Sequence, residues 1–322
     1  MPQTPLISEA DSVSLSISAG KHLRVELQSL IAASEMLIPA GQFPTPDAVH
    51  DIRVNMKRGR AILKLLRASP DARYYNRENS ALRDISALFS QSREADVLRK
   101  TIRYMAKKEP GVFNEQIIDW FRGIAGLESV GNAPDADKTD KTDKTDNADK
   151  VFRDNKASRA YIAADASERL ARAWYRVGFL NLRSVNRELL LDGLLNSFLR
   201  AEENYHRAKE SEHPAHIHEL RKRIKDLLYQ VRFFSDYNPD HFGKIYRELD
   251  NLGSILGKCN DLAVAINIAS GAGAGAETET EARTKFPAIG KAIQSMEMER
   301  VSLFRKVLPD VQKLFASFYS GA

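Results

Sequence analysis

The chain has 322 residues, of which 43% are hydrophobic, and a formal net charge of +5. That length and apolar content suffice for one large or two medium domains, and no run of about 18 apolar residues marks a membrane span. The single cysteine, Cys259, excludes an internal disulfide framework, and the first twenty residues lack the basic and apolar regions of a secretory signal, so the sequence predicts a soluble cytoplasmic protein.

The first part of the chain is predicted to contain a polar lead-in and a series of helices. Residues 1–20 form the lead-in, and apolar residues then recur at helical spacing. Thr45 and Pro46 form a good helix start, because a hydroxyl at the cap position accepts a backbone hydrogen bond and proline suits the first helical position. The expected helices cover about 21–38, 46–67, 71–89, 93–108 and 112–127.

The helix that begins at Pro46 has an apolar face and a separate cationic face. Ile52, Met56 and Leu63 cluster on one side of it. On the other side, cationic or titratable residues fall within about 60° of arc and extend along about 21 Å of helix. These residues are His50, Arg53, Lys57 and Lys64. A solvated helix face can carry the same pattern, but such a row also suits an extended polyanion, and the chain repeats it.

The second part of the chain begins with a linker. Residues 130–151 repeat Asp-Lys-Thr units without large apolar side chains, which predicts a disordered segment. Long helices are expected at about 152–183 and 185–210, and the next helix opens at Pro214. The remaining predictions are helices at 241–256 and 261–270 separated by a break at 257–260, a Gly/Ala-rich spacer at 271–282, and a final helix at 287–318 that Pro309 could interrupt. No stretch alternates with the period of a strand, so the predicted fold class is all-α.

A shift of 168 residues superimposes a second cationic helix on the first. Pro46, His50, Arg53, Lys57 and Lys64 then fall on Pro214, His218, Arg221, Lys225 and Arg232. A third series has the same spacing as the first, namely Arg169, Arg172, Arg176 and Arg183. An internal duplication of a helical unit explains the offset match better than chance. Two such units could place their cationic helices around a pseudo-twofold axis, lining one central cavity.

The two cationic helices carry motifs that resemble the CHAD family, the histidine-containing α-helical domains. The first copy, His-x-x-Arg-x-x-x-[Arg/Lys]-Arg-x-Arg, is matched by His50, Arg53, Lys57, Arg58 and Arg60. The second, His-x-x-Arg-x-x-x-Lys with an aromatic residue four positions later, is matched by His218, Arg221, Lys225 and Tyr229. A further family element, Leu-Gly-x-x-Arg-Asp-x-Asp-Val, is matched by Arg93, Asp96 and Val97, whereas Ser90 and Glu94 depart from it.

This resemblance implies two pseudo-symmetric helical bundles around a basic central cavity that binds inorganic polyphosphate. The bundles would be residues 21–129 and 152–320, in a stand-alone member without a fused triphosphatase-type CYTH domain. The resemblance also implies an association with polyphosphate granules. Phosphate favours arginine forks and lysine point charges. The predicted polyphosphate-binding residues are His50, Arg53, Lys57, Arg58, Arg60, Lys64, Arg93, Arg169, Arg172, Arg176, Arg183, His218, Arg221, Lys222, Lys225, Tyr229 and Arg232.

An enzyme or accessory factor acting on polyphosphate or on phosphorylated small molecules is the main alternative. The carboxylates near the motifs form no recognisable paired constellation, and no Gly-rich phosphate loop is present. These carboxylates are Asp51, Glu94, Asp96, Glu219 and Asp261. We therefore expect a non-catalytic protein that uses no cofactor.

Two further alternatives are nucleic-acid binding and metal binding. The cationic stripes lack interleaved aromatic residues on which bases could stack, which argues against single-stranded nucleic acid as a partner. His213, His216 and His218 lie on one short stretch without a cysteine partner, so the metal signal is weak. Whether His50 and His218 contact the ligand or stabilise their helices is open at this stage.

Overall fold

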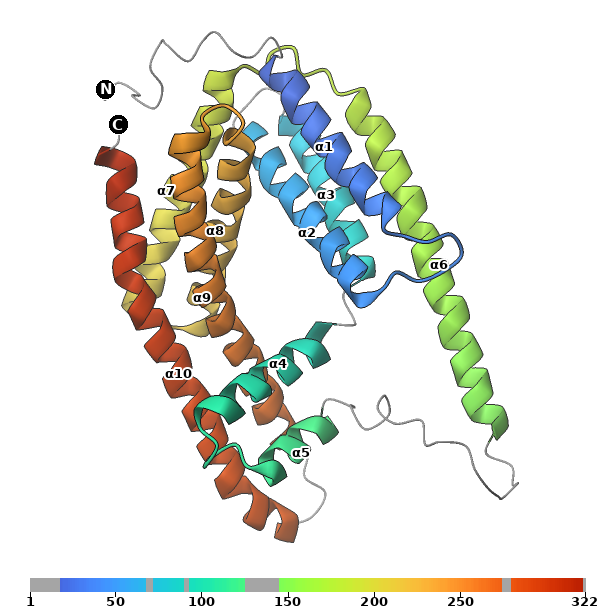
Figure 1. Cartoon of the computed structure of the whole chain (residues 1–322), viewed down its shortest axis with the longest axis vertical. Helices are drawn as coiled ribbons and strands as arrows, with labels where there is room; N and C mark the ends of the chain where they lie inside the picture. The colour runs from blue at the N-terminus through green and yellow to red at the C-terminus, as the bar shows by residue number, and fades with distance from the viewer. Residues whose placement is uncertain (1–17, 68–71, 90–92, 125–144, 274–278, 321–322) are drawn as a thin grey trace. The chain divides into compact units, whose positions relative to one another are not determined.

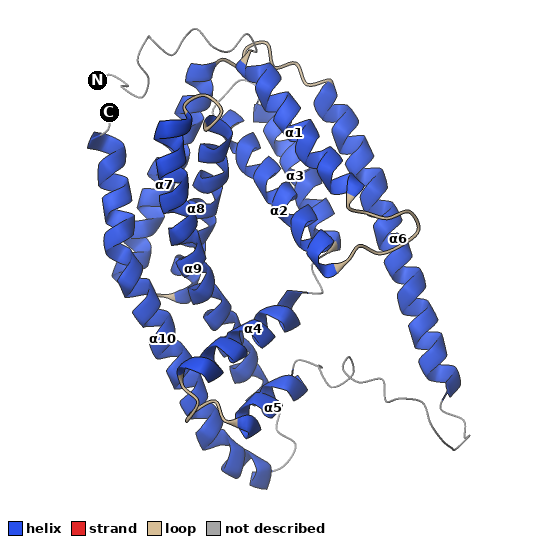
Figure 2. Ribbon diagram, in the orientation of Figure 1, coloured by secondary structure: helices blue, strands red, loops and turns tan. Residues whose placement is uncertain are grey.

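A computed structural model of the chain describes residues 18–67, 72–89, 93–124, 145–273 and 279–320. The regular secondary structure within these ranges is helical, which confirms the predicted all-α class (Figure 2). The predicted lead-in and most of the predicted linker lie outside the described residues. The elements are α1 (Ala19–Met36), α2 (Pro46–Leu63), the 3-10 turn η2 (Lys64–Leu66), α3 (Ala72–Leu88), α4 (Arg93–Lys108), α5 (Glu115–Ile124), α6 (Thr145–Gly178), α7 (Arg187–Ser211), α8 (Pro214–Phe234), α9 (Pro239–Gly273) and α10 (Glu279–Ser320).

The two cationic helices, α2 and α8, begin in the same way. The Thr45 side chain accepts a hydrogen bond of 3.3 Å from the backbone N–H of Ala48, and proline follows as the first helical residue. At the start of α8, Nδ1 of His213 accepts a hydrogen bond of 3.3 Å from the N–H of Ala215, again before a helix that begins with proline. Each cap satisfies one of the backbone donors that a helix start leaves unpaired.

The predicted break at 257–260 is wrong, because α9 continues through it to Gly273. Leu256, Cys259 and Leu262 are all buried, at the spacing of one helix face. A glycine inside a helix costs about 1 kcal/mol relative to alanine, whereas each buried apolar side chain contributes about 1.5–3 kcal/mol. Burial on this face therefore outweighs the helix-breaking tendency of Gly257.

Three other boundaries differ from the prediction. Helix α6 begins at Thr145, inside the range assigned to the linker, and ends at Gly178 instead of near residue 183. The predicted spacer 271–282 is shorter, since α9 reaches Gly273 and α10 begins at Glu279. Pro287 and Pro309 both lie inside α10, so neither ends it.

The chain forms two compact units, and each draws helices from both sides of the linker. One unit, called here the α2 unit, contains α1, α2, η2, α3, α6 and the first part of α7 up to Gly193. The other, called the α8 unit, contains α4, α5, the rest of α7, α8, α9 and α10. The units therefore do not coincide with the two halves expected from the sequence, 21–129 and 152–320.

The α2 unit is a bundle in which each helix buries one apolar face. Helix α1 packs against α2 and α6, and α3 packs against α2 and α6 (Figure 1). The core of this unit includes Leu27 of α1, Ile52 and Met56 of α2, Ile85 of α3 and Leu170 of α6, all nearly inaccessible to solvent. Because Ile52 and Met56 are buried as the sequence predicts, the cationic residues of α2 lie on its remaining surface.

The α8 unit is organised around the long helix α9. Helices α8 and α10 pack along α9, and α4 and α5 also contact it (Figure 1). An apolar cluster joins α4, α5, α9 and α10 and includes Met105, Phe121, Leu262 and Met296. Helix α7 reaches α10 through its aromatic residues, with Phe198 and Phe315 rings 4.9 Å apart in an edge-on arrangement.

Candidate polyanion-binding helices

In the α8 unit, predicted cations of α8 lie along one side of α9. Near the start of α8, Nδ1 of His218 forms a hydrogen bond with the side-chain oxygen of Asn260. Near the end of α8, the guanidinium of Arg232 donates a hydrogen bond of 3.5 Å to the hydroxyl of Tyr246 and lies 5.9 Å from the centre of that ring. The residue near the start of α8 thus contacts a later residue of α9, and the residue near the end of α8 contacts an earlier one. The two helices are therefore antiparallel, and the cations form a row along their seam.

Two glycines of α9 leave the space in which the central cations of this row lie. A Cβ at Gly253 would be 2.9 Å from Cε of Lys225, and a Cβ at Gly257 would be 3.7 Å from Nε of Arg221. The ammonium of Lys225 is also 3.4 Å from the carboxylate of Asp250. Because no side chain projects from the two glycines, the stem of Lys225 and the guanidinium of Arg221 lie close to the backbone of α9, which restricts their positions.

In the α2 unit, cations of α2 are held in a similar way by the helix that follows it. The guanidinium of Arg53 donates a hydrogen bond of 2.8 Å to the backbone carbonyl of Ser86 on α3. About two turns further along α2, Nε of Arg60 donates to the side-chain oxygen of Asn79, also on α3, at 3.1 Å. In both units the cationic helix therefore packs against the next helix in the chain, which restrains some of its charged side chains.

The other predicted residues of α2 are placed differently. Arg58 turns towards α1, where its guanidinium is 3.1 Å from the carboxylate of Glu26. Lys57 and Lys64 are half-buried, whereas the ring of His50 is exposed at the start of the helix. The two motif histidines thus differ, because His218 has an asparagine partner on α9 and His50 has an exposed ring.

The predicted arginines of the α6 series make different contacts and do not share one face towards a common site. Arg176 crosses to α3, where its Nη2 and Nε donate to the carboxylate of the buried Glu78 at 3.0 and 3.1 Å. Arg169 and Arg172 instead pair with carboxylates one turn earlier on α6 itself. The hydrogen bond that Nε of Arg169 donates to the carboxylate of Asp165 raises the pKa of Arg169. Arg176 of α6 therefore contacts α3, as Arg53 and Arg60 of α2 also do. The fourth residue, Arg183, is exposed beyond the end of α6.

The remaining predicted residues belong to α8 and α4. Lys222 pairs with Glu219 at 2.6 Å, and this hydrogen bond holds the pKa of the Glu219 carboxyl below its ordinary value. Tyr229 is half-buried on α8. Arg93 is the first residue of α4, but its side chain lies outside the described part of the structure.

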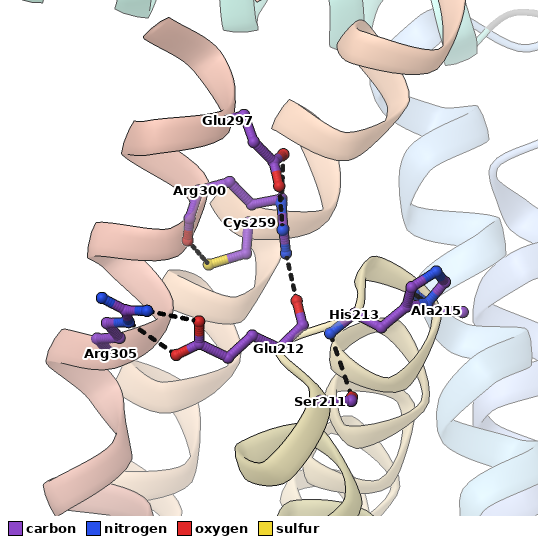
Figure 3. Close-up of polar contacts among 8 residues, drawn as sticks. All are labelled: Ser211, Glu212, His213, Ala215, Cys259, Glu297, Arg300 and Arg305. Carbon is purple, nitrogen blue, oxygen red and sulfur yellow. Dashed lines mark hydrogen bonds and ion pairs between the residues drawn. The ribbon is translucent and has the colours of Figure 1, made fainter. Parts of the chain in front are cut away.

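The turn between α7 and α8 is held by α10, which sequence reasoning did not predict (Figure 3). Glu212 has a left-handed backbone, with φ of 49°, and its carboxylate receives two hydrogen bonds of 2.7 and 2.8 Å from Arg305. Its carbonyl accepts a further hydrogen bond of 3.1 Å from Arg300, a buried arginine that also binds Glu297. The hydrogen bond from Arg305 lowers the pKa of Glu212. These contacts fix the position of His213, the cap residue of α8.

The contacts on α3 and α9 were also missed. Ser86, Asn79 and Glu78 carry no local sign that they hold arginines, since their partners are distant in sequence. Gly253 and Gly257 do carry a signal, because residues four apart lie on one helix face and glycine there permits close approach. The local sequence instead predicted a break in the helix beginning at Gly257.

The other titratable groups of the described residues give no sign of a metal centre or of a reactive thiol. Among the described residues, no three His, Cys, Asp or Glu side chains are grouped to hold a metal ion. Burial raises the pKa of the Cys259 thiol to about 12, so the thiol is protonated at neutral pH. None of the helices in the described part of the chain is long and apolar enough to cross a membrane.

Comparison with family models finds one described as the CHAD domain, which matches residues 23–270. The matched range begins within α1 and ends within α9, so it includes both cationic helices, α3 and most of α9, but not α10. No curated protein and no solved structure matches the chain.

Proposed function

The chain belongs to the CHAD domain family, and from this premise we propose that it binds inorganic polyphosphate through the cationic faces of α2 and α8, without cleaving it. The observation that carries the proposal is the arrangement of those two helices. Each bears a histidine, an arginine and a lysine at the same spacing, begins with a capped proline, and packs against the following helix. The predicted central cavity and the internal repeat are part of this proposal.

The row on α8 suits a linear polyanion for electrostatic and geometric reasons. From His218 to Arg232 the row extends over about 21 Å of helix, which is longer than a single phosphate group requires. Guanidinium groups offer several donors to phosphate oxygens, and hydrogen bonds between charged groups are the strong ones. Because Lys225 and Arg221 are restricted by α9, less side-chain freedom is lost when they bind.

A non-catalytic role is supported by the engagement of nearby carboxylates. Glu78 binds Arg176, Glu219 binds Lys222, and Asp250 lies beside Lys225. These carboxylates orient cations, and we assign them no role in activating water. An enzyme acting on polyphosphate remains the competing proposal, and phosphate release distinguishes the two.

The test is a titration of the protein with polyphosphate between 50 and 200 mM salt, with phosphate release followed in the same samples in the presence of Mg²⁺ or Mn²⁺. Binding through about six cations predicts that affinity falls on the order of a thousandfold across this range, by analogy with other phosphate polymers. DNA and RNA serve as competitors at fixed salt. Release of orthophosphate would support the enzyme, and stronger competition by nucleic acid than by polyphosphate would overturn the proposed ligand.

A further inference from the structure

Helix α6 presents an exposed aromatic face that the proposed function does not use. Tyr161, Tyr175 and Phe179 are 74%, 62% and 73% exposed, and the rings of the last two lie 4.8 Å apart. Glu168 and Arg172 lie between the aromatic groups and pair with each other, with side chains 59% and 68% exposed. At 100° per residue, the four of these residues that lie within α6 fall on a stripe within about 60° of arc, and Phe179 follows directly after the last residue of the helix.

Four residues of this stripe are placed symmetrically about its middle, with an aromatic ring at each end and an acid opposite a base near the centre. Tyr161 and Phe179 lie nine residues either side of Leu170, and Glu168 and Arg172 lie two residues either side of it. A twofold axis through the middle of the stripe would therefore place aromatic against aromatic and acid against base. Self-complementarity of this kind is what an interface between two identical subunits requires.

We infer that α6 is a homodimer contact, in which it docks antiparallel on α6 of a second copy of this chain. Tyr161 of each copy packs on Phe179 and Tyr175 of the other, and Glu168 of each copy pairs with Arg172 of the other. Two helices packed at 8–10 Å bring such side chains into contact. The inference is independent of polyphosphate binding.

Charge explains why a second copy fits this face better than single-stranded nucleic acid does. The structure shows that, contrary to the sequence interpretation, aromatic residues do flank an arginine of the α6 series. However, Arg172 is neutralised by Glu168 and Arg169 by Asp165, so the stripe has no excess positive charge with which to attract a phosphate backbone. A face with balanced charges and exposed aromatics instead resembles a protein interface.

The expected dimer is weak. A contact between one helix of each copy lies at the low end of interface sizes, so we expect a Kd in the range of about 10–100 μM. Sedimentation equilibrium of the full chain at several concentrations, without polyphosphate, measures it directly. A wild-type chain that stays monomeric well above this range overturns the inference.

Charge exchange gives the sharpest test. Glu168→Arg places two arginines at the centre of the stripe, Arg172→Glu places two glutamates there, and each variant alone is expected to dimerise at least about tenfold more weakly because like charges then oppose each other. An equimolar mixture of the two variants restores complementary pairs and is expected to form a heterodimer about as well as the wild type dimerises. Failure of the mixture to associate, with both variants folded by circular dichroism, contradicts the antiparallel arrangement.

A substitution of the aromatic group completes the test. Phe179→Ser is expected to weaken the dimer about tenfold, whereas the control Met36→Ser removes a side chain that is 87% exposed on α1 and is expected to leave the dimer unchanged. Equal effects of the two substitutions would point to non-specific association and overturn the inference. If the wild-type chain stays monomeric and binds single-stranded RNA, and Phe179→Ser abolishes that binding, the face would be assigned to nucleic acid instead.

Discussion

Arg176 of α6 binds the buried carboxylate of Glu78 on α3, with Nη2 of the arginine 3.0 Å from Oε2 of the glutamate. Arg77 binds the same carboxylate from its own helix at 2.6 Å. The contact between Arg176 and Glu78 connects two helices that are 98 residues apart in sequence at this point. The sequence alone predicted that Arg176 binds polyphosphate. In the structure its guanidinium makes a stabilising contact within the α2 unit.

Arg176→Ala is expected to destabilise the protein. Removing one partner of a buried ion pair leaves charge that is poorly compensated, which typically costs about 3–5 kcal/mol, and retention of Arg77 should reduce the loss to about 2–3 kcal/mol. Chemical unfolding followed by circular dichroism measures the change. The control is Arg172→Ala, which removes an exposed pair on the same helix and is expected to cost under about 1 kcal/mol. Equal losses for the two variants would contradict the stabilising role.

Gly253→Ala is expected to weaken polyphosphate binding without lowering the stability of the protein. A methyl group at this position would lie 2.9 Å from Cε of Lys225, so the flexible lysine must move from its place over α9. Alanine favours the helix by up to about 1 kcal/mol relative to glycine, so stability should be unchanged or higher. Polyphosphate affinity should nevertheless fall several-fold in a titration at fixed salt.

Gly290→Ala is the matched control for that prediction. Gly290 lies in α10, and nothing is within 4 Å of the Cβ that it would gain. It should gain the same helix propensity without changing polyphosphate affinity. Unchanged affinity in Gly253→Ala would show that the glycine does not position Lys225 for the ligand.

The contact between Glu212 and Arg305 predicts a pH-dependent contribution to stability. Because the folded protein lowers the pKa of Glu212, its contribution is present above the ordinary glutamate value of 4.5 and is lost as the pH falls through the lower folded value. Glu212→Gln should therefore unfold at a lower temperature than the wild type at pH 7. That difference should shrink as the pH falls below about 4.5.

Glu203→Gln serves as the control for Glu212, because it removes an exposed pair with Arg207 within α7. Its effect on the unfolding temperature should be small at every pH. A constant difference between Glu212→Gln and the wild type from pH 7 to pH 3 would mean that the ion pair is not the source of the effect.

Cys259 is expected to be unreactive in the folded protein. Its thiol is buried, its pKa is raised to about 12 by that burial, and it donates a weak hydrogen bond of 3.7 Å to the carbonyl of Arg300. A thiol reagent at pH 8 should label almost none of the native chain and one thiol per chain in denaturant. Rapid labelling of the native protein would show that α9 and α10 separate readily at this point.

Local patterns predicted most helices, because each buries one apolar face at the helical period. Helix α4 begins and ends at the predicted residues, α2 has the predicted cap at Thr45, and α8 begins at Pro214 as predicted. The continuity of α9 could not be predicted locally, since it depends on the burial of Cys259 and Leu262 against distant helices. Local glycine preference was the competing signal, and packing outweighed it.

The organisation of the units and the contacts of the site depend on long-range packing. No local feature indicates that α6 joins α1 to α3, or that α4 and α5 pack on α9. The spacing of His218, Arg221 and Lys225 predicted one cationic face, and these residues do lie along one seam with α9. The partners of Arg176 and Glu212 were not predictable, because a surface-like arginine or glutamate has the same local sequence pattern whether or not it meets a distant charge.

The most direct test of the central proposal is a polyphosphate titration of the variant in which Arg53, Lys57, Arg221 and Lys225 are all changed to glutamine. Its control removes the same charge from exposed positions outside the motifs, by changing Arg200, Arg207, Lys209 and Lys306 to glutamine. At 0.1 M salt the motif variant should bind at least about tenfold more weakly than the control and show a smaller dependence of affinity on salt, by about one unit of log–log slope for each lost phosphate contact. Equal affinities and equal salt slopes for the two variants would contradict the assignment of polyphosphate binding to α2 and α8.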